Sequence, residues 1–544
     1  MDDACIAYCV LNDSYIHGCT AVELPSAVGV RSTTMTLQPA RFDNSLEVSP
    51  KVFALAFLIA YCLSQIPIYL VEVPPLVDYP NHLARMAILS DAGKSAVLRE
   101  FYEIRWGFYP NLAMDLIVPP LSHVVGVEVA GKLFISFVML LLVSGTAALS
   151  IALHRRLTLW PLVAFLFLYN RSFLWGFLNF LFGVGLALWG VACWVYLRER
   201  SSRLRVLMGC IWAAAIFLAH LSALGVYGLI VAGYEWQRNP IRRSGTNFGD
   251  WAVLFAQFTV PAIIFLFVSP TAAHYQEVTV QGLAFFFESK IRGLINPVSN
   301  YSMWLDGATF LVLVGGGAIA LYKGWITVAP RMRWALLGLV AFALVMPYTL
   351  FGSAFADRRL PAAIAFFLVA STTPQIYGRR LINLTGAMLT GLFVVRLVLV
   401  GHQWIESNRI YAPYLKSFDS LPVGARLYYV AGYEHGKKET FPTPLDHIAS
   451  YAVIRRSVFL PSLFGYPFAG GQPLAYTSTY APLVNWVRSP ASTLNQAPNW
   501  ERLAADYDYL FVVRPELLAI PPPVDRVTPV SSGDNFRLYK SSRQ

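Results

Sequence analysis

The sequence predicts an α-helical polytopic membrane protein with about eleven transmembrane helices and a small α/β domain at its C-terminal end. Three observations lead to this fold class. Of the 544 residues, 56% are hydrophobic and only 13% are charged, and the mean hydropathy of +0.51 argues against a water-soluble protein. Apolar runs of about 20 residues recur along the chain, separated by short basic clusters. These runs stop near residue 400, beyond which strand-like stretches alternate with Pro/Gly-rich loops.

The formal net charge of +11 does not indicate a nucleic-acid-binding protein. Basic residues sit in short clusters between apolar runs and form no broad basic face, so we expect membrane lipid and no nucleic acid as a partner. All six cysteines lie within the first 19 residues or inside apolar segments, which excludes a disulfide framework in exposed loops.

Residues 1–50 are expected to form a disordered cytoplasmic segment. They are polar, irregular in pattern and lack a basic region followed by an apolar stretch, as a signal peptide would have. Met35 would make an ordinary start shortly before the first span, so N-terminal sequencing must decide whether residues 1–34 are translated.

The expected spans follow from the length that a bilayer requires. A hydrocarbon core of about 30 Å needs roughly 20 apolar residues per helix. Clear matches lie at 52–71, 133–153, 173–197, 252–269, 334–354, 360–376 and 381–400. Shorter runs lie at 157–169, 206–219, 221–236 and 307–322.

The distribution of charge supports counting all eleven runs as crossings. The loops on one side then hold 14 Lys or Arg in 41 residues, whereas the loops on the other side hold 10 in 107. The denser side is cytoplasmic by the positive-inside rule. We therefore expect a multi-pass protein of the cell inner membrane, with a transmembrane domain at 51–401, a first external loop at 72–132, and an extracytoplasmic (periplasmic) α/β domain at 402–544. In that domain, strands are expected at 426–431, 507–513 and 535–540.

The start of the first external loop holds the strongest catalytic candidate, Asp78. Pro80 suits the first turn of a helix, so the helix dipole would favour an ionised Asp78, with His82 and Arg85 projecting from the first two turns. An ionised carboxylate can accept the proton of a hydroxyl acceptor, while cationic groups or a metal ion stabilise a phosphate leaving group. We predict that Asp78 and His82 are catalytic and that Arg85 binds phosphate. The simpler interpretation is that Asp78 only caps the helix.

Two further external segments carry candidate binding residues. Arg358 and Arg359 lie between the ninth and tenth spans, where two guanidinium forks could bind a lipid-linked phosphate or merely anchor the helix. In the aromatic loop 270–306, His274 and Glu277 are three residues apart and could share a substrate or a metal ion if that stretch is helical. The metal requirement is left open, with a divalent metal ion as the candidate cofactor.

Together these features resemble the GT-C superfamily of membrane glycosyltransferases. The resemblance covers roughly residues 50–400 and rests on Asp78 at the exit of span one, the long first external loop, the odd number of spans and the external C-terminal domain. The run from Asp357 to Pro361 is similar to the Arg-Tyr-Leu-Leu-Pro type of segment in bacterial members related to the aminoarabinose and mannosyl transferases. The resemblance implies transfer of a sugar from a polyprenyl-phosphate donor to an acceptor hydroxyl on the extracytoplasmic face.

The sequence also departs from the family pattern. Many members carry two adjacent acidic residues in the first loop, whereas Asp78 stands alone and the nearest other acid is Glu72, which puts a two-carboxylate metal site in doubt. Arg359 stands where the family often has Tyr. The sugar and the acceptor are not fixed by the fold.

Two other classes of protein remain as alternatives. A transporter or flippase of lipid-linked saccharide would need polar or broken helices at the bilayer midplane, but apart from Asn179 and a break at His220 the spans offer few such groups. A polymerase or ligase of surface polysaccharide would be expected to have its large external loop late in the chain, whereas the largest loop here is the first.

Overall fold

In the computed structural model, the described residues are 46–91, 93–238, 248–271, 282–350, 353–376, 378–432, 444–465, 472–487, 493–494, 497–518 and 520–542. The segment expected to be disordered, residues 1–50, lies almost wholly outside this set. Residues 44–544 form one unit by their internal contacts.

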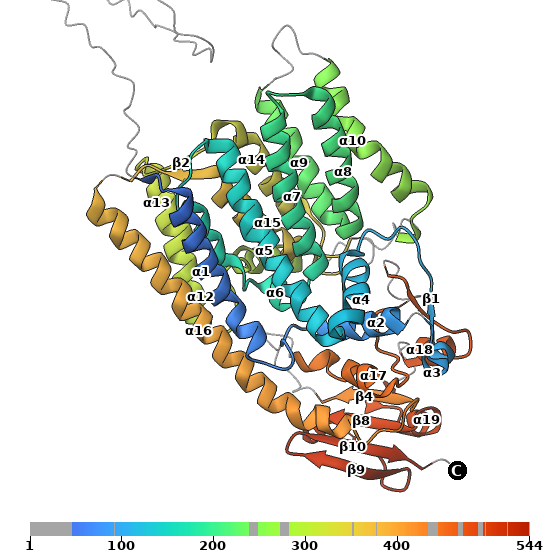
Figure 1. The fold of residues 1–544 in the computed structure, drawn as a ribbon. Helices are drawn as coiled ribbons and strands as arrows, with labels where there is room; N and C mark the ends of the chain where they lie inside the picture. The colour runs from blue at the N-terminus through green and yellow to red at the C-terminus, as the bar shows by residue number, and fades with distance from the viewer. Residues whose placement is uncertain are drawn as a thin grey trace, which may run out of the picture. The chain divides into compact units, whose positions relative to one another are not determined.

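The chain is mainly helical up to about residue 420 (Figure 1). Its longer helices are α1 (Pro50–Tyr69), α2 (Tyr79–Asp91), α4 (Ala113–Val125), α5 (Val127–His154), α7 (Leu178–Leu197), α8 (Ser202–Ala219), α9 (Leu221–Arg238), α10 (Phe248–Phe267), α11 (Leu283–Ile295), α12 (Met303–Phe310), α14 (Arg333–Val345), α15 (Ala356–Ser371) and α16 (Arg379–Phe418). Shorter helical pieces are α3 (Ala96–Phe101), η2 (Trp160–Phe167), α6 (Arg171–Leu174), η4 (Leu311–Gly315), α13 (Gly316–Tyr322) and η5 (Pro330–Met332).

Six helices among the described residues are long and apolar enough to cross a membrane. They are α1, α5, α7, α8, the continuous stretch from α12 to α13, and α16. A membrane location is therefore supported, while the number of about eleven crossings stays a prediction. The last of these helices continues for 40 residues, well past the apolar run at 381–400 that identified it.

The run 157–169, which was expected to be a helical span, contains only the eight-residue 3-10 helix η2. The chain nevertheless passes along the bundle here. Val48, just before α1, donates a hydrogen bond to Leu157, whereas Val77, beyond the other end of α1, donates one to Leu174. The segment between Leu157 and Leu174 therefore runs the length of α1 without forming a long α-helix, because a tighter helix and extended residues cover more distance per residue.

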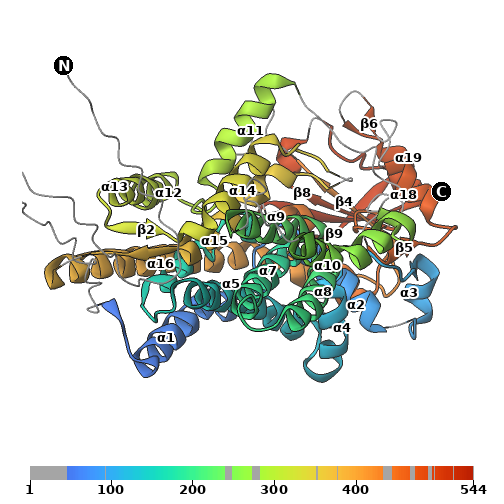
Figure 2. The same cartoon turned by 90° about the horizontal axis from the view of Figure 1, so that it is seen from above.

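Helices α5 and α7 pack closely because glycines lie at their contact. A Cβ atom at Gly145 would come within 2.8 Å of the Leu188 Cβ, and one at Gly185 within 2.7 Å of the Leu141 Cβ. Small residues of this kind let membrane helices approach each other closely. Helices α8 and α9 pack on the same α7, and α10 and α14 pack on α8 and α9 in turn (Figure 2).

The C-terminal part contains a four-stranded mixed sheet in the order β4-β8-β10-β9. Strands β4 (Leu427–Ala431), β8 (Tyr509–Val513) and β10 (Phe536–Ser541) confirm the three expected strands, and β9 (Val527–Gly533) was not expected. The sheet pairs β4 with β8 in parallel and the other neighbours antiparallel. The remaining elements described in this part are η6 (Pro444–His447), α17 (Ser450–Arg456), β5 (Leu474–Tyr476), α18 (Ala481–Val487), β6 (Thr493–Leu494), β7 (Ala497–Pro498), α19 (Trp500–Asp506) and η8 (Pro515–Leu517).

The first loop and the C-terminal part share structure. Strand β1 (Tyr102–Ile104) of the loop pairs antiparallel with β5 of the C-terminal part, and α17 packs on α2. The hydroxyl of Tyr102 donates to the Val458 carbonyl at 3.2 Å and accepts from the Leu460 N–H at 2.9 Å. Through this junction, C-terminal residues lie next to the start of α2, where Asp78 is located.

Candidate active site

Asp78 ends the connection between α1 and α2 and is held by its main chain. Its N–H donates to the Trp175 carbonyl at 3.0 Å, beside the bond from Val77 to Leu174. Gly176 turns the chain here with φ +87°, and a Cβ atom on it would lie 3.1–3.2 Å from the backbone and Cβ of Asp78. The glycine therefore permits the close approach that positions the carboxyl group.

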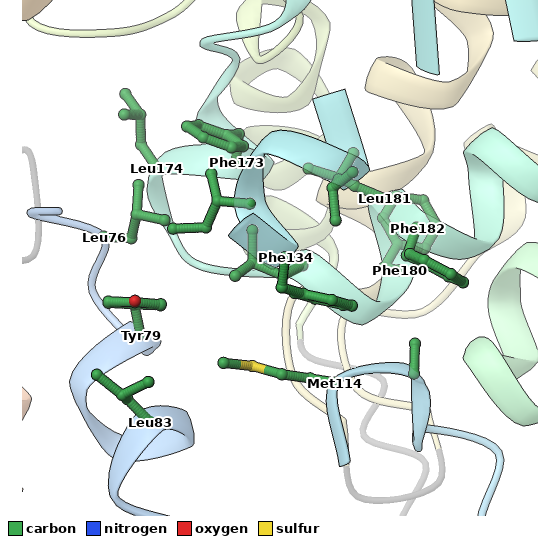
Figure 3. Close-up of a cluster of buried hydrophobic side chains, with 14 of the residues drawn as sticks. Leu76, Tyr79, Leu83, Met114, Phe134, Phe173, Leu174, Phe180, Leu181 and Phe182 are labelled. Carbon is green, nitrogen blue, oxygen red and sulfur yellow. The ribbon is translucent and has the colours of Figure 1, made fainter. Parts of the chain in front are cut away.

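A buried apolar cluster supports the start of α2 (Figure 3). Tyr79 and Leu83 of α2 belong to the same cluster as Phe134 of α5 and Met114 of α4. Other members come from the connection, α6 and α7: Leu76, Phe173, Leu174, Phe180, Leu181 and Phe182. Since α5 and α7 form the centre of the helix bundle, this packing places Asp78 at the end of the bundle.

The carboxyl of Asp78 is not a helix cap in this structure. Within the described part of the chain, no main-chain N–H of α2 donates to it, and His447 Nε2 lies 3.7 Å from it. Its side chain is 16% exposed. Burial raises the pKa of Asp78 to about 7, with the Arg359 guanidinium lowering it and Asp446 raising it. The helix start was expected to favour the ionised form, but burial raises the pKa because the cost of burying the charge exceeds the effect of the dipole.

Asn81 fixes the orientation of His447. The amide oxygen of Asn81 accepts from the Phe464 N–H at 2.8 Å, and its nitrogen donates to the Ser462 carbonyl at 2.9 Å, so the amide can be placed only one way round. The same nitrogen lies 3.3 Å from His447 Nδ1. Nδ1 must then act as the acceptor, which leaves the proton on Nε2, the atom that faces Asp78.

His82 and Arg85 form a second layer behind this pair. Arg85 makes a buried bidentate ion pair with Asp115 of α4, at 2.8 and 3.0 Å. Its remaining nitrogen lies 3.0 Å from His82 Nδ1 and also donates to Gln472. Burial and the charge of Arg85 lower the pKa of His82 well below its usual range, so the imidazole is neutral and carries its proton on Nε2.

Arg359 approaches the site from α15. Its guanidinium carbon lies 4.0 Å from the centre of the Phe177 ring, one terminal nitrogen lies 3.1 Å from His220 Nε2, and the other donates to the Ala354 carbonyl at 2.8 Å. Its Nε is buried and has no hydrogen-bond partner among the described residues. The charge of Arg359 acts on Asp78, which places the two on the same site.

Arg358 points to a different set of neighbours. Its Nε donates to Ser289 Oγ at 2.9 Å, and its guanidinium carbon lies 5.4 Å from the Phe355 ring and 5.6 Å from the Tyr348 ring. Phe355 itself adopts a left-handed conformation with φ 58°, which is rare for an aromatic residue. The two arginines thus flank the start of α15 and do not form one fork.

An apolar groove of about 520 Å³ lies between α9, α10 and α14. One end is formed by Leu221 and Ser222, which directly follow His220, and by Met346 and Leu350. Since His220 contacts Arg359, the groove leads from the sides of the membrane helices toward the cationic part of the site.

The remaining candidates lie elsewhere. His274 and Glu277 fall outside the described residues. Glu72, the acid nearest to Asp78 in sequence, is half-exposed and pairs with Arg455 at 2.7 Å. Among the described residues, no group of three or more His, Cys, Asp or Glu side chains is arranged to hold a metal ion.

Sequence reasoning missed His447 and Asp115. His447 is 369 positions beyond Asp78, in a part of the chain that was expected to be a separate domain. Asp115 had a weak signal, because a lone acid in an apolar helix of an external loop usually needs a partner. Arg85, 30 residues earlier, is that partner.

This architecture is shared with solved structures of ArnT, in line with the resemblance that the sequence predicted. It is similar to the crystal structure of ArnT from Cupriavidus metallidurans bound to undecaprenyl phosphate, with a TM-score of 0.53, 13% identity, and coverage of 90% of this chain and 98% of ArnT. The apo structure of the same ArnT gives a TM-score of 0.54, 14% identity, and coverage of 90% and 97%. Identities this low show a shared fold alone. No protein-family model and no curated protein sequence matches the chain.

Proposed function

We propose that the chain is a membrane glycosyltransferase that moves a sugar from a polyprenyl-phosphate-linked donor to an acceptor hydroxyl on the extracytoplasmic face. The proposal rests mainly on the carboxyl group of Asp78. This group does not cap α2, its main chain is held by a hydrogen bond, and its pKa is about 7. A general base works best when its pKa lies near the working pH. The fold shared with ArnT, whose crystal structure holds undecaprenyl phosphate, supports the lipid-linked donor.

In the proposed reaction, the acceptor oxygen attacks the anomeric carbon of the donor sugar while its proton passes to the Asp78 carboxylate. The bond between the anomeric carbon and the phosphate oxygen breaks, and polyprenyl phosphate leaves with the electron pair. His447 faces the Asp78 carboxylate with its Nε2–H at 3.7 Å and would help to orient it, and Asn81 holds the imidazole in that tautomer. His82, which is neutral, would act as a hydrogen-bond donor through its Nε2.

Arg359 is the residue best suited to the donor phosphate. Its fixed positive charge lies within the electrostatic reach of Asp78, and its Nε has no hydrogen-bond partner among the described residues. Arg358 lies at the start of the same helix and would stabilise the phosphate from its aromatic surroundings. The donors of Arg85 are used by Asp115, His82 and Gln472, so we assign Arg85 a positioning role.

The apolar groove between α9, α10 and α14 suits the polyprenyl chain. Its walls are almost entirely apolar and its inner end lies next to His220, the contact of Arg359. A lipid bound there would bring its phosphate toward Arg359 with the sugar beyond it.

Mass spectrometry of cell-envelope glycolipids and glycans tests the proposal. We expect a sugar-bearing species in cells that make the wild-type chain and its absence both without the chain and with Asp78→Asn. The polyprenyl-phosphate-linked form of that sugar should accumulate in the last two. Identical spectra in all three strains would refute the proposal.

A further inference from the structure

At the end of the helix bundle away from Asp78, a cavity of about 390 Å³ opens between α5, α7 and α9. The C-terminal ends of these three helices meet here, next to η5 at the start of α14. Three charged side chains line the cavity, namely Arg155, Glu199 and Arg331. The charges of the loops predict that this end faces the cytoplasm.

Both arginines lie within ion-pair range of one carboxylate, that of Glu199. The closest approach to Glu199 is 3.8 Å for Arg155 and 3.5 Å for Arg331. Charge-assisted hydrogen bonds are about 2.7–2.9 Å long, and the bidentate pair of Arg85 with Asp115 shows that this chain can form them. Glu199 therefore does not use up the donor capacity of either guanidinium, and the three groups leave a net positive charge at the cavity mouth.

The backbone also contributes to this arrangement. Arg155 caps the C-terminus of α5 in a left-handed conformation with φ 55°, a position that usually takes glycine. Left-handed residues other than glycine are strained and concentrate at functional sites. Arg155 lines the cavity, whereas the neighbouring Arg156 pairs with Glu47.

The cavity is also lined by apolar residues that come from three of the helices. They are Ala152 and Leu153 of α5, Val195 of α7 and the ring of Tyr234 on α9. A free inorganic anion would gain nothing from these residues. A phospholipid could place its phosphate between the guanidinium groups and its glycerol and first acyl carbons against these residues, as in known basic pockets between membrane helices.

We propose that this cavity binds the phosphate headgroup of an anionic phospholipid. The site is separate from the glycosyl-transfer site, so it stands or falls independently of the proposed function. The carboxylate of Glu199 opposes anion binding. Removing its charge should therefore strengthen lipid binding, which is not expected of a simple surface ion-pair cluster.

Native mass spectrometry of the purified full chain, delipidated and titrated with phosphatidylglycerol or phosphatidylcholine, tests the site. We expect preferential binding of phosphatidylglycerol. Arg155→Ala and Arg331→Ala should each weaken it about fivefold and together about thirtyfold, because one basic residue near an anionic lipid is worth about that factor. Arg203→Ala is the matched control, since Arg203 is exposed at the same end in the first turn of α8 and does not line the cavity.

The variant Glu199→Gln is expected to bind lipid more strongly, a result that misfolding cannot produce. It should strengthen phosphatidylglycerol binding, because it removes the competing carboxylate and keeps a side chain of similar shape. Unchanged or weaker binding in Glu199→Gln, or equal losses in Arg203→Ala and the double variant, would overturn the site. Displacement of the lipid by inorganic phosphate at similar concentration would show a free-anion site and would overturn the lipid assignment.

Discussion

Replacing Asp78 by Asn should lower turnover but raise the stability of the folded protein at high pH. Burial raises the pKa of this carboxyl from its ordinary 3.8 to about 7. A difference of about three in pKa corresponds to about 4 kcal/mol. Because the folded state holds the proton more tightly than the unfolded state, this stabilising contribution is fully present below about pH 4 and is lost as the pH rises to about 7.

Asparagine keeps the shape of the side chain but has no charge to bury. We therefore expect Asp78→Asn to match the wild type near pH 4 and to become more stable by up to about 4 kcal/mol at pH 8. Turnover should fall by about 10² to 10⁴, the usual contribution of a positioned base. The wild-type rate should rise with pH through about 7, as the base loses its proton.

The apparent melting temperatures of the wild type and Asp78→Asn would be measured in detergent at pH 4.5 and pH 8.5. Turnover would be measured on the same preparations. Glu72→Gln is the control, because Glu72 lies in the same connection but is half-exposed and paired with Arg455. If Asp78 is only a helix cap, Asn will cap as well as Asp, and the variant will keep near-normal turnover and show no gain in stability at pH 8.5. That result would exclude Asp78 as the general base.

Three other predictions concern binding, positioning and topology. Arg359→Ala should raise the KM for the lipid donor with little change in melting temperature, and Arg358→Ala should raise it to a smaller extent. An unchanged KM in both variants would show that these residues only anchor the helix in the membrane. His447→Ala should lower kcat about tenfold and move the acidic limb of the pH–rate profile to higher pH, since the carboxylate loses a donor that favours its ionised form; an unmoved profile would leave His447 with a purely structural role. Reporter fusions at Ser420 and Gly378 should report opposite compartments, and the same compartment at both would break the predicted topology.

Features that depend on local sequence could be predicted. The helix beginning at Tyr79 follows from Pro80 and the apolar spacing after it, and the three strands β4, β8 and β10 follow from alternating or buried β-branched and aromatic runs. The place of Asp78 at the exit of α1 is local in the same sense. These features could be predicted because the local residue pattern indicates them, although the strands also need their partners in the sheet.

Features that depend on contacts between distant residues could not be predicted. His447 reaches Asp78 only because the C-terminal part pairs with the first loop through β1 and β5, and no pattern near either residue indicates that pairing. The pKa of Asp78 was misjudged for the same reason, since the helix dipole is visible in the sequence whereas burial is a property of the packed fold.

Two polar residues in the predicted spans stood out in the sequence, but their contacts could not be predicted from it. Asn179 stood out in an apolar helix, and in the structure it accepts from the Met114 N–H at 2.9 Å and donates to the Asn111 carbonyl at 2.8 Å. It thereby fastens the first loop to α7. His220 marked a break between two spans, and in the structure it contacts Arg359. Both residues therefore make contacts with the first loop or with a candidate binding residue.

The most direct test of glycosyl transfer is the fate of the lipid donor in proteoliposomes. Purified wild-type chain and Asp78→Asn would be reconstituted with lipid extract from cells that lack the protein, together with an extract of candidate acceptors, and polyprenyl phosphate would be measured by mass spectrometry. We predict that the wild type releases polyprenyl phosphate and forms a glycosylated acceptor, whereas Asp78→Asn leaves the donor intact. An intact donor that merely becomes accessible from the other leaflet with the wild-type chain would exclude glycosyl transfer and identify a flippase.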